Sequence, residues 1–165
     1  MRGTRRRFLA VAALSAFACA SPAPEPAPIV GRPAPDFVLP ALDGSSIQLS
    51  SLRGKPVVVN FFATWCGPCR FELPTFQVLA DREAARRLTF LLVDLQEDAA
   101  SVREFLDGLN VNLPTVLDET GEVTKLYRVR GLPATYFVGR DGYIHAVQLG
   151  ALDERLLVAG IEKII

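Results

Sequence analysis

PVVVNFFATWCGPC, residues 56–69, joins a strongly apolar run to a pair of cysteines. The run PVVVNFFA (56–63) is rich in valine and phenylalanine and carries no charge, which is typical of a strand buried on both faces of a sheet. The motif WCGPC (65–69) follows at once, and RFELPTFQVLADREAARR (70–87) then has helical periodicity. The stretch therefore predicts a central strand, a cysteine motif and a helix in direct succession.

Strand and helix patterns alternate along the rest of the chain. One hairpin is expected at 35–50, closed by Asp43 and Gly44, and another at 134–150, around the turn 140–142. LTFLLVDL (88–95) predicts a second buried strand. Three further segments predict helices, namely ASVREFLDGLN (100–110), TGEVTKLYRV (120–129, capped by Thr120) and LDERLLVAGIEKI (152–164). This order predicts an α/β sandwich with a mixed sheet.

Composition limits the number of domains and the classes of partner. A chain of 165 residues, half of them hydrophobic, predicts one domain with a substantial core. Lys and Arg together number 18, as do Asp and Glu, so no excess of charge argues for a nucleic-acid partner.

The first twenty residues predict an export signal rather than part of the fold. Arg2 and residues 5–7, all arginine, precede an apolar stretch, 8–18, that is too short to span a bilayer as a mature helix. TRRRFLA resembles a twin-arginine signal, and an ordinary secretory signal with a basic start is the alternative.

Cys19 ends this apolar stretch. AFAC resembles a bacterial lipobox, in which the cysteine is acylated, although Ala16 and Phe17 depart from that pattern. The alternative is ordinary cleavage after Ala18 or Ala20. Residues 21–34 are proline-rich and predict an extended spacer, so the folded domain is expected over 35–165. A lipid at Cys19 would give the protein its one attachment to a membrane.

The pair Cys66 and Cys69 suits electron transfer better than metal binding or a purely structural disulfide. A closed zinc site needs four ligands, and the mature domain offers these two cysteines and His145. A disulfide across two residues closes a loop too small to add much stability. At a helix start, unpaired N–H groups stabilise a thiolate, which predicts Cys66 as the exposed nucleophile. Cys69, one turn further on, can then attack the mixed disulfide.

FFATWCGPCRFELP (61–74), followed by GLPATYFVGRDG (131–142), resembles the thioredoxin superfamily, and most closely its exported TlpA/ResA-type thiol–disulfide oxidoreductases. The resemblance extends over 35–165. It implies a thioredoxin-like α/β sandwich, with a mixed central sheet flanked by helices and an N-terminal β-hairpin. It also implies a redox-active disulfide and no further cofactor.

The resemblance assigns substrate contacts around the cysteines. Trp65 would form part of the docking surface. Gly67 permits close approach of another chain, and Pro68 lacks an N–H, which costs nothing in a first helical turn. Pro133 matches the cis-proline of the family, and that bond would expose the backbone of Leu132 to an incoming peptide strand. Pro74 resembles the proline that kinks the helix after the motif.

Two positions bear on proton transfer, and two more bear on the surroundings of the cysteines. Asn60 stands where thioredoxin has a buried aspartate, and an amide cannot carry a proton. Glu97 matches a glutamate given that role in ResA-like proteins, and its alternative is a solvated acidic turn with Asp94 and Asp98. Glu72 matches a glutamate common in the TlpA-like group, which implies an influence on substrate recognition or on the local field, and an exposed helix charge is its alternative. Ala134 replaces the threonine usual after the cis-proline, which alters the groove beside the cysteines.

These observations predict a monomeric enzyme outside the cytoplasm that reduces disulfides in exported proteins. The resemblance implies substrates such as apocytochrome c or copper-site proteins, and a membrane thiol transporter as electron donor. The alternative from another class is a copper chaperone on the same scaffold, with Cys66, Cys69 and His145 as ligands.

Overall fold

The computed structural model describes residues 29–165. The predicted export signal, Cys19 and residues 21–28 of the predicted spacer lie outside the described residues. Residues 29–34, expected as the end of the spacer, lie against the start of β7 (Ile144–Leu149), where Gly31 N donates to Ile144 O at 2.8 Å.

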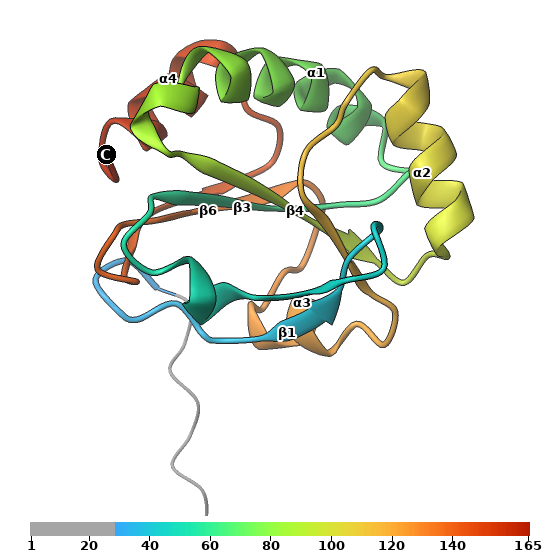
Figure 1. Cartoon of the computed structure of the whole chain (residues 1–165), viewed down its shortest axis with the longest axis horizontal. Coiled ribbons are helices and arrows are strands. Elements are labelled where there is room, and N and C mark those ends of the chain that lie inside the picture. The colour runs from blue at the N-terminus through green and yellow to red at the C-terminus, as the bar shows by residue number, and fades with distance from the viewer. Residues whose placement is uncertain (1–28) are drawn as a thin grey trace, which may run out of the picture.

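A five-stranded mixed sheet forms the centre of the molecule (Figure 1), in the order β5-β4-β3-β6-β7. The predicted central strand is β3 (Val57–Phe62), and every one of its residues is buried. It pairs in parallel with β4 (Thr89–Leu95), which pairs in parallel with β5 (Thr115–Asp118). On its other side β3 pairs antiparallel with β6 (Ala134–Val138), which forms the predicted second hairpin with β7. The predicted fold class, a thioredoxin-like sandwich, is confirmed.

The N-terminal hairpin is also present. Strands β1 (Val38–Pro40) and β2 (Ser46–Gln48) pair antiparallel as a separate two-stranded sheet. A bridge from Ala41 to Val116 connects this hairpin to the edge strand β5.

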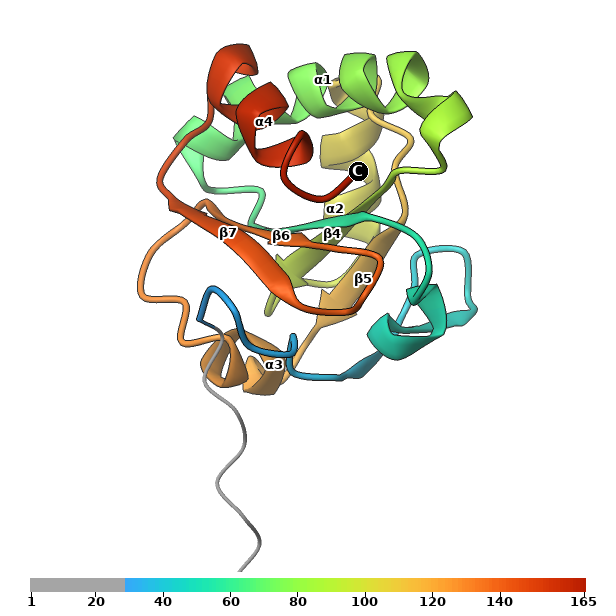
Figure 2. The same ribbon diagram turned by 90° about the vertical axis from the view of Figure 1, so that its left-hand side faces the viewer.

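Helices cover both faces of the central sheet. Figure 2 shows α1 (Gly67–Arg82) and α4 (Glu154–Ile161) on one face, which they share with α2 (Ala99–Gly108). The opposite face carries α3 (Glu122–Leu126) and the N-terminal hairpin (Figure 1). Short 3-10 turns occur at η1 (Leu49–Leu52) and η2 (Ala84–Arg86). No helix within 29–165 is long and apolar enough to cross a membrane.

Each face of the sheet has its own core, because side chains alternate along β3. Phe62 packs with Phe76 of α1 and Phe105 of α2, while Phe61 packs with Tyr127 and Tyr136 on the opposite face. The buried tyrosine hydroxyls are satisfied by backbone carbonyls, as the hydroxyl of Tyr136 donates to Tyr127 O at 2.6 Å. The cysteine motif lies over the core of α1, α2 and α4.

Two local predictions were wrong in detail. The helix expected over 70–87 ends at Arg82 and continues as a 3-10 turn, and Arg87 has a φ of 59°. The N-cap position of α3 is Gly121 rather than Thr120, whose hydroxyl accepts only a long hydrogen bond from the N–H of Glu122 at 3.4 Å. The Asp118 carboxylate accepts from the N–H groups of Val123 and Thr124 at 3.2 and 2.7 Å. A carboxylate at this helix start satisfies donors that the first turn leaves unpaired.

Candidate active site

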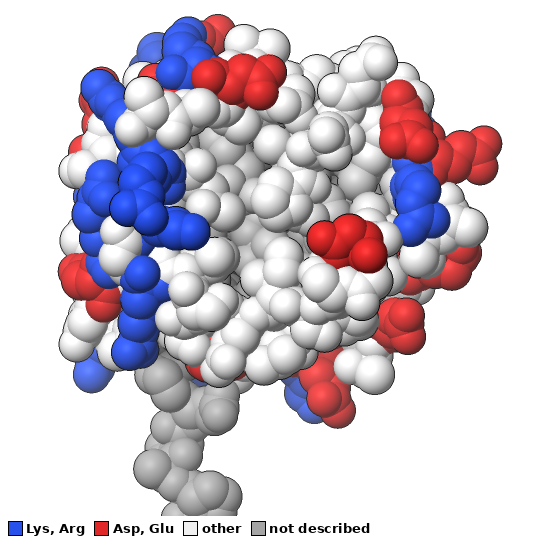
Figure 3. Space-filling model, in the orientation of Figure 1, with Lys and Arg blue, Asp and Glu red and all other residues white. Residues whose placement is uncertain are grey.

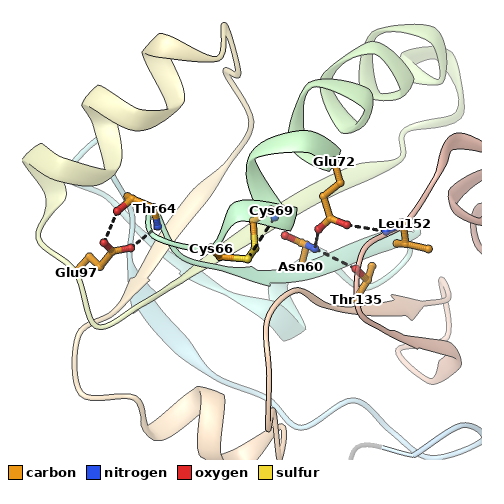
Figure 4. The surroundings of a disulfide bond; sticks show 8 residues. All are labelled: Asn60, Thr64, Cys66, Cys69, Glu72, Glu97, Thr135 and Leu152. Carbon is orange, nitrogen blue, oxygen red and sulfur yellow. Dashed lines mark hydrogen bonds between the residues drawn. A yellow bond between two sulfur atoms is a disulfide. The ribbon is translucent and has the colours of Figure 1, made fainter.

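Cys66 and Cys69 form a disulfide at the carboxyl end of β3, where α1 begins (Figure 4). Cys66 is the N-cap of α1, and its Sγ accepts a hydrogen bond from the N–H of Cys69 at 3.3 Å. Cys69 is fully buried and Cys66 is 4% exposed. The expectation of an exposed Cys66 is therefore corrected: Cys66 is buried, although it keeps a small exposure that Cys69 lacks.

The other residues of the motif surround this opening. Gly67 and Pro68 are the first two residues of α1, and an added Cβ at Gly67 would meet no atom within 4 Å. Trp65 is 68% exposed, so most of its ring faces solvent beside the disulfide. Phe71, in the first turns of α1, is 81% exposed. An apolar surface thus lies next to the cysteines.

The peptide bond between Leu132 and Pro133 is cis, as predicted. Pro133 precedes β6, whose Ala134 pairs with Phe61 of β3, so the register brings the proline to the same end of the sheet as the cysteine motif. The carbonyl of Pro133 accepts from the N–H of Gly150 at 2.9 Å, which ties the proline loop to the end of β7. Ala134 is fully buried.

Glu72 lies in the interior of the protein, so its interpretation as an exposed helix charge was wrong. It is 2% exposed, and its carboxylate accepts from the Nδ2 of Asn60 and from the N–H of Leu152, both at 2.9 Å. Asn60 Nδ2 also donates to the hydroxyl of Thr135 at 3.0 Å (Figure 4). Burial raises the pKa of Glu72 to about 7, against the lowering effect of its two hydrogen bonds. A carboxyl that titrates near neutrality therefore sits one helical turn after Cys69.

Glu97 is held against the loop that precedes the cysteines. Its carboxylate accepts from the N–H of Thr64 at 2.6 Å and from the hydroxyl of Thr64 at 2.5 Å. Glu97 is thus tied to the motif rather than free in a solvated turn, while Asp98 caps α2. The role of Glu97 in proton transfer stays a prediction.

Asp94 supports Glu97 from inside β4. Asp94 is fully buried and accepts from the N–H of Glu97 at 3.1 Å, while its Oδ1 has no hydrogen-bond partner. Burial and the neighbouring Glu97 raise the pKa of Asp94 above its ordinary range. Two carboxyl groups therefore meet at the end of β4, next to the loop that carries Cys66.

The structure does not bring together the ligands of the proposed copper site. The Nε2 of His145 lies 3.1 Å from both carboxylate oxygens of Asp141, at the turn between β6 and β7. This turn is at the end of the sheet opposite to the cysteines. In the described part of the chain, no three side chains of His, Cys, Asp or Glu are grouped as metal ligands. His145 therefore cannot serve as the third ligand of a copper site at Cys66 and Cys69, as the copper-chaperone hypothesis requires.

Sequence reasoning missed the environments of Glu72, Thr64 and Asp94. One signal for Glu72 was present, because it lies three residues after Cys69 and one before Leu73, on the face of α1 that is buried. Thr64 had no such signal, because its partner Glu97 is 33 residues away.

Comparisons with known proteins agree with the fold and the site. Residues 30–147 match the AhpC/TSA family. The chain is 39% identical over 127 residues to the thiol-disulfide oxidoreductase ResA of Oceanobacillus iheyensis, covering 74% of this chain and 66% of that protein. It is 33% identical to the ResA of Geobacillus kaustophilus, over 82% of this chain and 78% of that protein.

Solved structures extend the likeness to three dimensions. A thiol:disulfide interchange protein of the thioredoxin family from Chlorobium tepidum superposes with a TM-score of 0.71 at 27% identity, over 79% of this chain and 93% of that one. StoA from Bacillus subtilis gives a TM-score of 0.67 at 26% identity, over 78% and 97% of the two chains.

Proposed function

Because the chain belongs to the AhpC/TSA family, and within it to the relatives of ResA-type thiol-disulfide oxidoreductases, we propose that it reduces disulfides of exported proteins through Cys66 and Cys69. The observation that carries the proposal is the position of Cys66 as N-cap of α1, with its sulfur accepting the N–H of Cys69. The same donors favour a thiolate on Cys66 once the pair is reduced. The cysteines themselves carry the two electrons, so the proposal includes no other cofactor.

The first step begins from the reduced pair. The thiolate of Cys66 attacks one sulfur of a substrate disulfide, which forms a mixed disulfide and releases one substrate thiolate. The residual exposure of Cys66 and the complete burial of Cys69 support this order of attack.

In the second step Cys69 loses its proton and attacks Cys66 Sγ. The Cys66–Cys69 disulfide forms, the second substrate thiolate leaves, and both substrate thiolates take up protons. The chain has then given up two electrons and the proton of Cys69, while the second proton comes from the solvent that received it when Cys66 ionised. The pair is now in the oxidised form that the structure describes.

Carboxyl groups near the pair are the candidates for moving the proton of Cys69. Glu72 has a pKa of about 7 and follows Cys69 by one turn, so near neutrality it is poised between its two protonation states. Glu97 would act from the loop side, through Thr64, and Asp94 would hold Glu97 in place. Asn60 connects to Glu72 but carries no proton of its own.

Substrate docking is proposed around the cis-proline. The backbone of Leu132 would pair with an extended peptide, and Trp65, Gly67 and Pro68 would line the approach to Cys66. The exposure of Trp65 and the open space beside Gly67 support this arrangement.

The compartment and the partners complete the proposal. The export signal over 1–20 would place residues 35–165 outside the cytoplasm, tethered through Cys19 or free. The chain would act there as a monomer on apocytochrome c or copper-site proteins, and a membrane thiol transporter would reduce it again. Support comes from the sequence of the first 34 residues and from the ResA relatives.

Trapping the mixed disulfide tests this function. In a Cys19→Ser background, a Cys69→Ser variant should stall after the first step and retain a covalently bound substrate that dithiothreitol releases. The matched Cys66→Ser variant should retain nothing. Equal capture by both variants would contradict the order of attack.

The reduction potential tests the direction of electron flow. A reductant requires a potential near that of thioredoxin, roughly −270 mV, whereas a value near −120 mV would identify an oxidant.

A further inference from the structure

Positive charge gathers at the end of the sheet opposite to the disulfide. The chain as a whole has 18 basic and 18 acidic residues, but four arginines and one glutamate lie within 1–28, so the described domain is net acidic. Figure 3 nevertheless shows Lys and Arg side chains collected along the left-hand edge of the molecule. This edge carries the turns that precede β3 and β4 and the turn between β6 and β7 (Figure 1).

Hydrogen bonds hold these three turns together. Gly54 N donates to Arg140 O at 2.9 Å, and Arg140 Nη1 donates back to Gly54 O at 3.3 Å. Arg140 Nη2 donates to Arg86 O at 3.4 Å. We call the resulting surface the basic pole, and its cationic residues are Arg53, Lys55, Arg86, Arg87 and Arg140.

Carboxylates neutralise only a small part of the basic pole. Glu83 forms a salt bridge with Arg86 at 3.2 Å. Within residues 29–165 no salt bridge involves the other four cations of the pole. Asp141, which follows Arg140, pairs instead with His145. Since the rest of the domain is acidic, this local cationic surface is not explained by composition.

The basic pole lies beside the point where the N-terminal segment joins the domain. Ala34 N donates to Gly142 O at 2.9 Å, and a Cβ at Gly142 would lie 3.2 Å from the Nε of Arg53. Residue 29 is therefore the end of a segment that runs past the pole, and it is ten residues from Cys19 in the sequence.

The disulfide lies at the far end of the same strand. Lys55 and Pro56 precede β3, and Cys66 follows it. A strand of six residues spans about 20 Å at roughly 3.3 Å per residue, so the basic pole and the cysteines face away from each other.

We propose that the basic pole binds the anionic headgroups of a phospholipid membrane and turns the disulfide away from the bilayer. Lys and Arg near an anionic surface each contribute an attraction that acts within about a Debye length, and the exposed turns of the pole can approach a surface that closely. A protein held beside a membrane by its N-terminus would gain from this contact, because its redox end would then face soluble substrates. The inference rests on the placement of charge and not on the redox chemistry.

Binding to vesicles tests the proposal. The full chain is floated with vesicles of equimolar phosphatidylglycerol and phosphatidylcholine, and with vesicles of phosphatidylcholine alone. Arg53→Gln/Lys55→Gln/Arg87→Gln should bind the anionic vesicles more weakly than the parent, by up to about 100-fold at an attraction of about 1 kcal/mol per cation, and by less as salt is raised. Its activity on a soluble disulfide should be unchanged.

The control removes the same charge elsewhere. Lys125→Gln/Arg128→Gln/Arg130→Gln likewise removes three cations. All three are exposed, and Arg128 is at positive φ like Arg87. This control should bind like the parent, and the arginines within 1–28 contribute equally to every variant. Equal weakening of both triple variants, or none in either, would overturn the proposal.

The fluorescence of Trp65, the single tryptophan of the chain, reports the orientation of the bound protein on the membrane. It lies at the disulfide end, so phospholipids with brominated acyl chains should leave its fluorescence unquenched in the bound protein, while aqueous iodide should quench it. Strong quenching by the brominated lipids would show that the apolar surface around Trp65 meets the bilayer, and it would overturn the proposed orientation.

Discussion

Glutamine in place of Glu72 should remove a dependence of stability on pH. Burial raises the pKa of Glu72 to about 7 in the native protein, against an ordinary value of 4.5. A raised native pKa means that its stabilisation is complete below pH 4.5 and is lost as the pH rises through 7. Each pH unit between the two values is worth about 1.4 kcal/mol, so ionised Glu72 destabilises the native state by about 3 kcal/mol above pH 8.

The contacts of Glu72 suggest that glutamine can replace it with little other cost. The carboxylate accepts from Leu152 N and from Asn60 Nδ2. A glutamine can keep the first bond, and its NH₂ group can face the Oδ1 of Asn60 if that amide turns over. Asn60 Oδ1 is buried and has no partner now, so the turned amide gains a donor. The expected loss is at most one hydrogen bond, about 1 kcal/mol.

Urea unfolding of the oxidised chain, measured from pH 4.5 to pH 8.5, checks this prediction. Glu72→Gln and the parent should have unfolding free energies within about 1 kcal/mol at the acid end, where Glu72 is protonated. At the alkaline end the variant should be more stable by roughly 2–3 kcal/mol. If the unfolding free energies of the two proteins changed in parallel over the whole pH range, the raised pKa of Glu72 would be refuted.

Three further changes probe the surroundings of the disulfide and the packing that supports it. Asp94→Asn should leave the unfolding free energy at pH 4 within about 1 kcal/mol of the parent and raise it progressively towards pH 8, because the raised native pKa of Asp94 costs stability at every pH above its ordinary value of 3.8, and urea titrations at the two pH values measure this. Thr64→Val removes the hydroxyl bonded to Glu97 and should cost about 1–2 kcal/mol of unfolding free energy, whereas a loss below a few tenths would mean that the contact is solvent-separated. Gly160→Ala should cost about 1–3 kcal/mol, since its Cβ would collide with the ring of Phe137 in β6, while the matched Gly108→Ala, with open space around it, should cost nothing in the same thermal unfolding assay.

The sequence predicts the strands β3 and β4 well because each is an apolar run of the right length, whereas the buried strand β5, TVLD, was not predicted because it is only four residues long and ends in an aspartate. VVVNFF and TFLLVDL are seven residues or fewer, and both become fully or largely buried strands. The cysteine motif was placed correctly for a related reason, because a helix pattern begins directly after the first of these runs. The helix limit at Arg82 was not predicted, since no glycine or proline marks the change to a 3-10 turn.

Contacts between distant residues account for what the sequence could not predict. Glu72 is buried because Leu152, 80 residues further on, donates to it and covers it. Asn60 reaches Thr135 across 75 residues. Asp118 accepts the two shorter hydrogen bonds at the start of α3, because the end of β5 points its carboxylate at the helix start, and Thr120 accepts only one long bond. In each case the local sequence is compatible with both outcomes, and only the packing of separate elements decides.

Alkylation of reduced Cys66 most directly tests the central claim, which is that the start of α1 favours a thiolate on this cysteine. The reduced chain, in a Cys19→Ser background, is treated with iodoacetamide at a series of pH values, and mass spectrometry identifies the modified cysteine. The amide donors at the start of α1 should make Cys66 react first, with a rate that reaches half its maximum well below the value of about 8.5 found for free cysteine. A midpoint at or above 8.5, or faster modification of Cys69, would contradict the account.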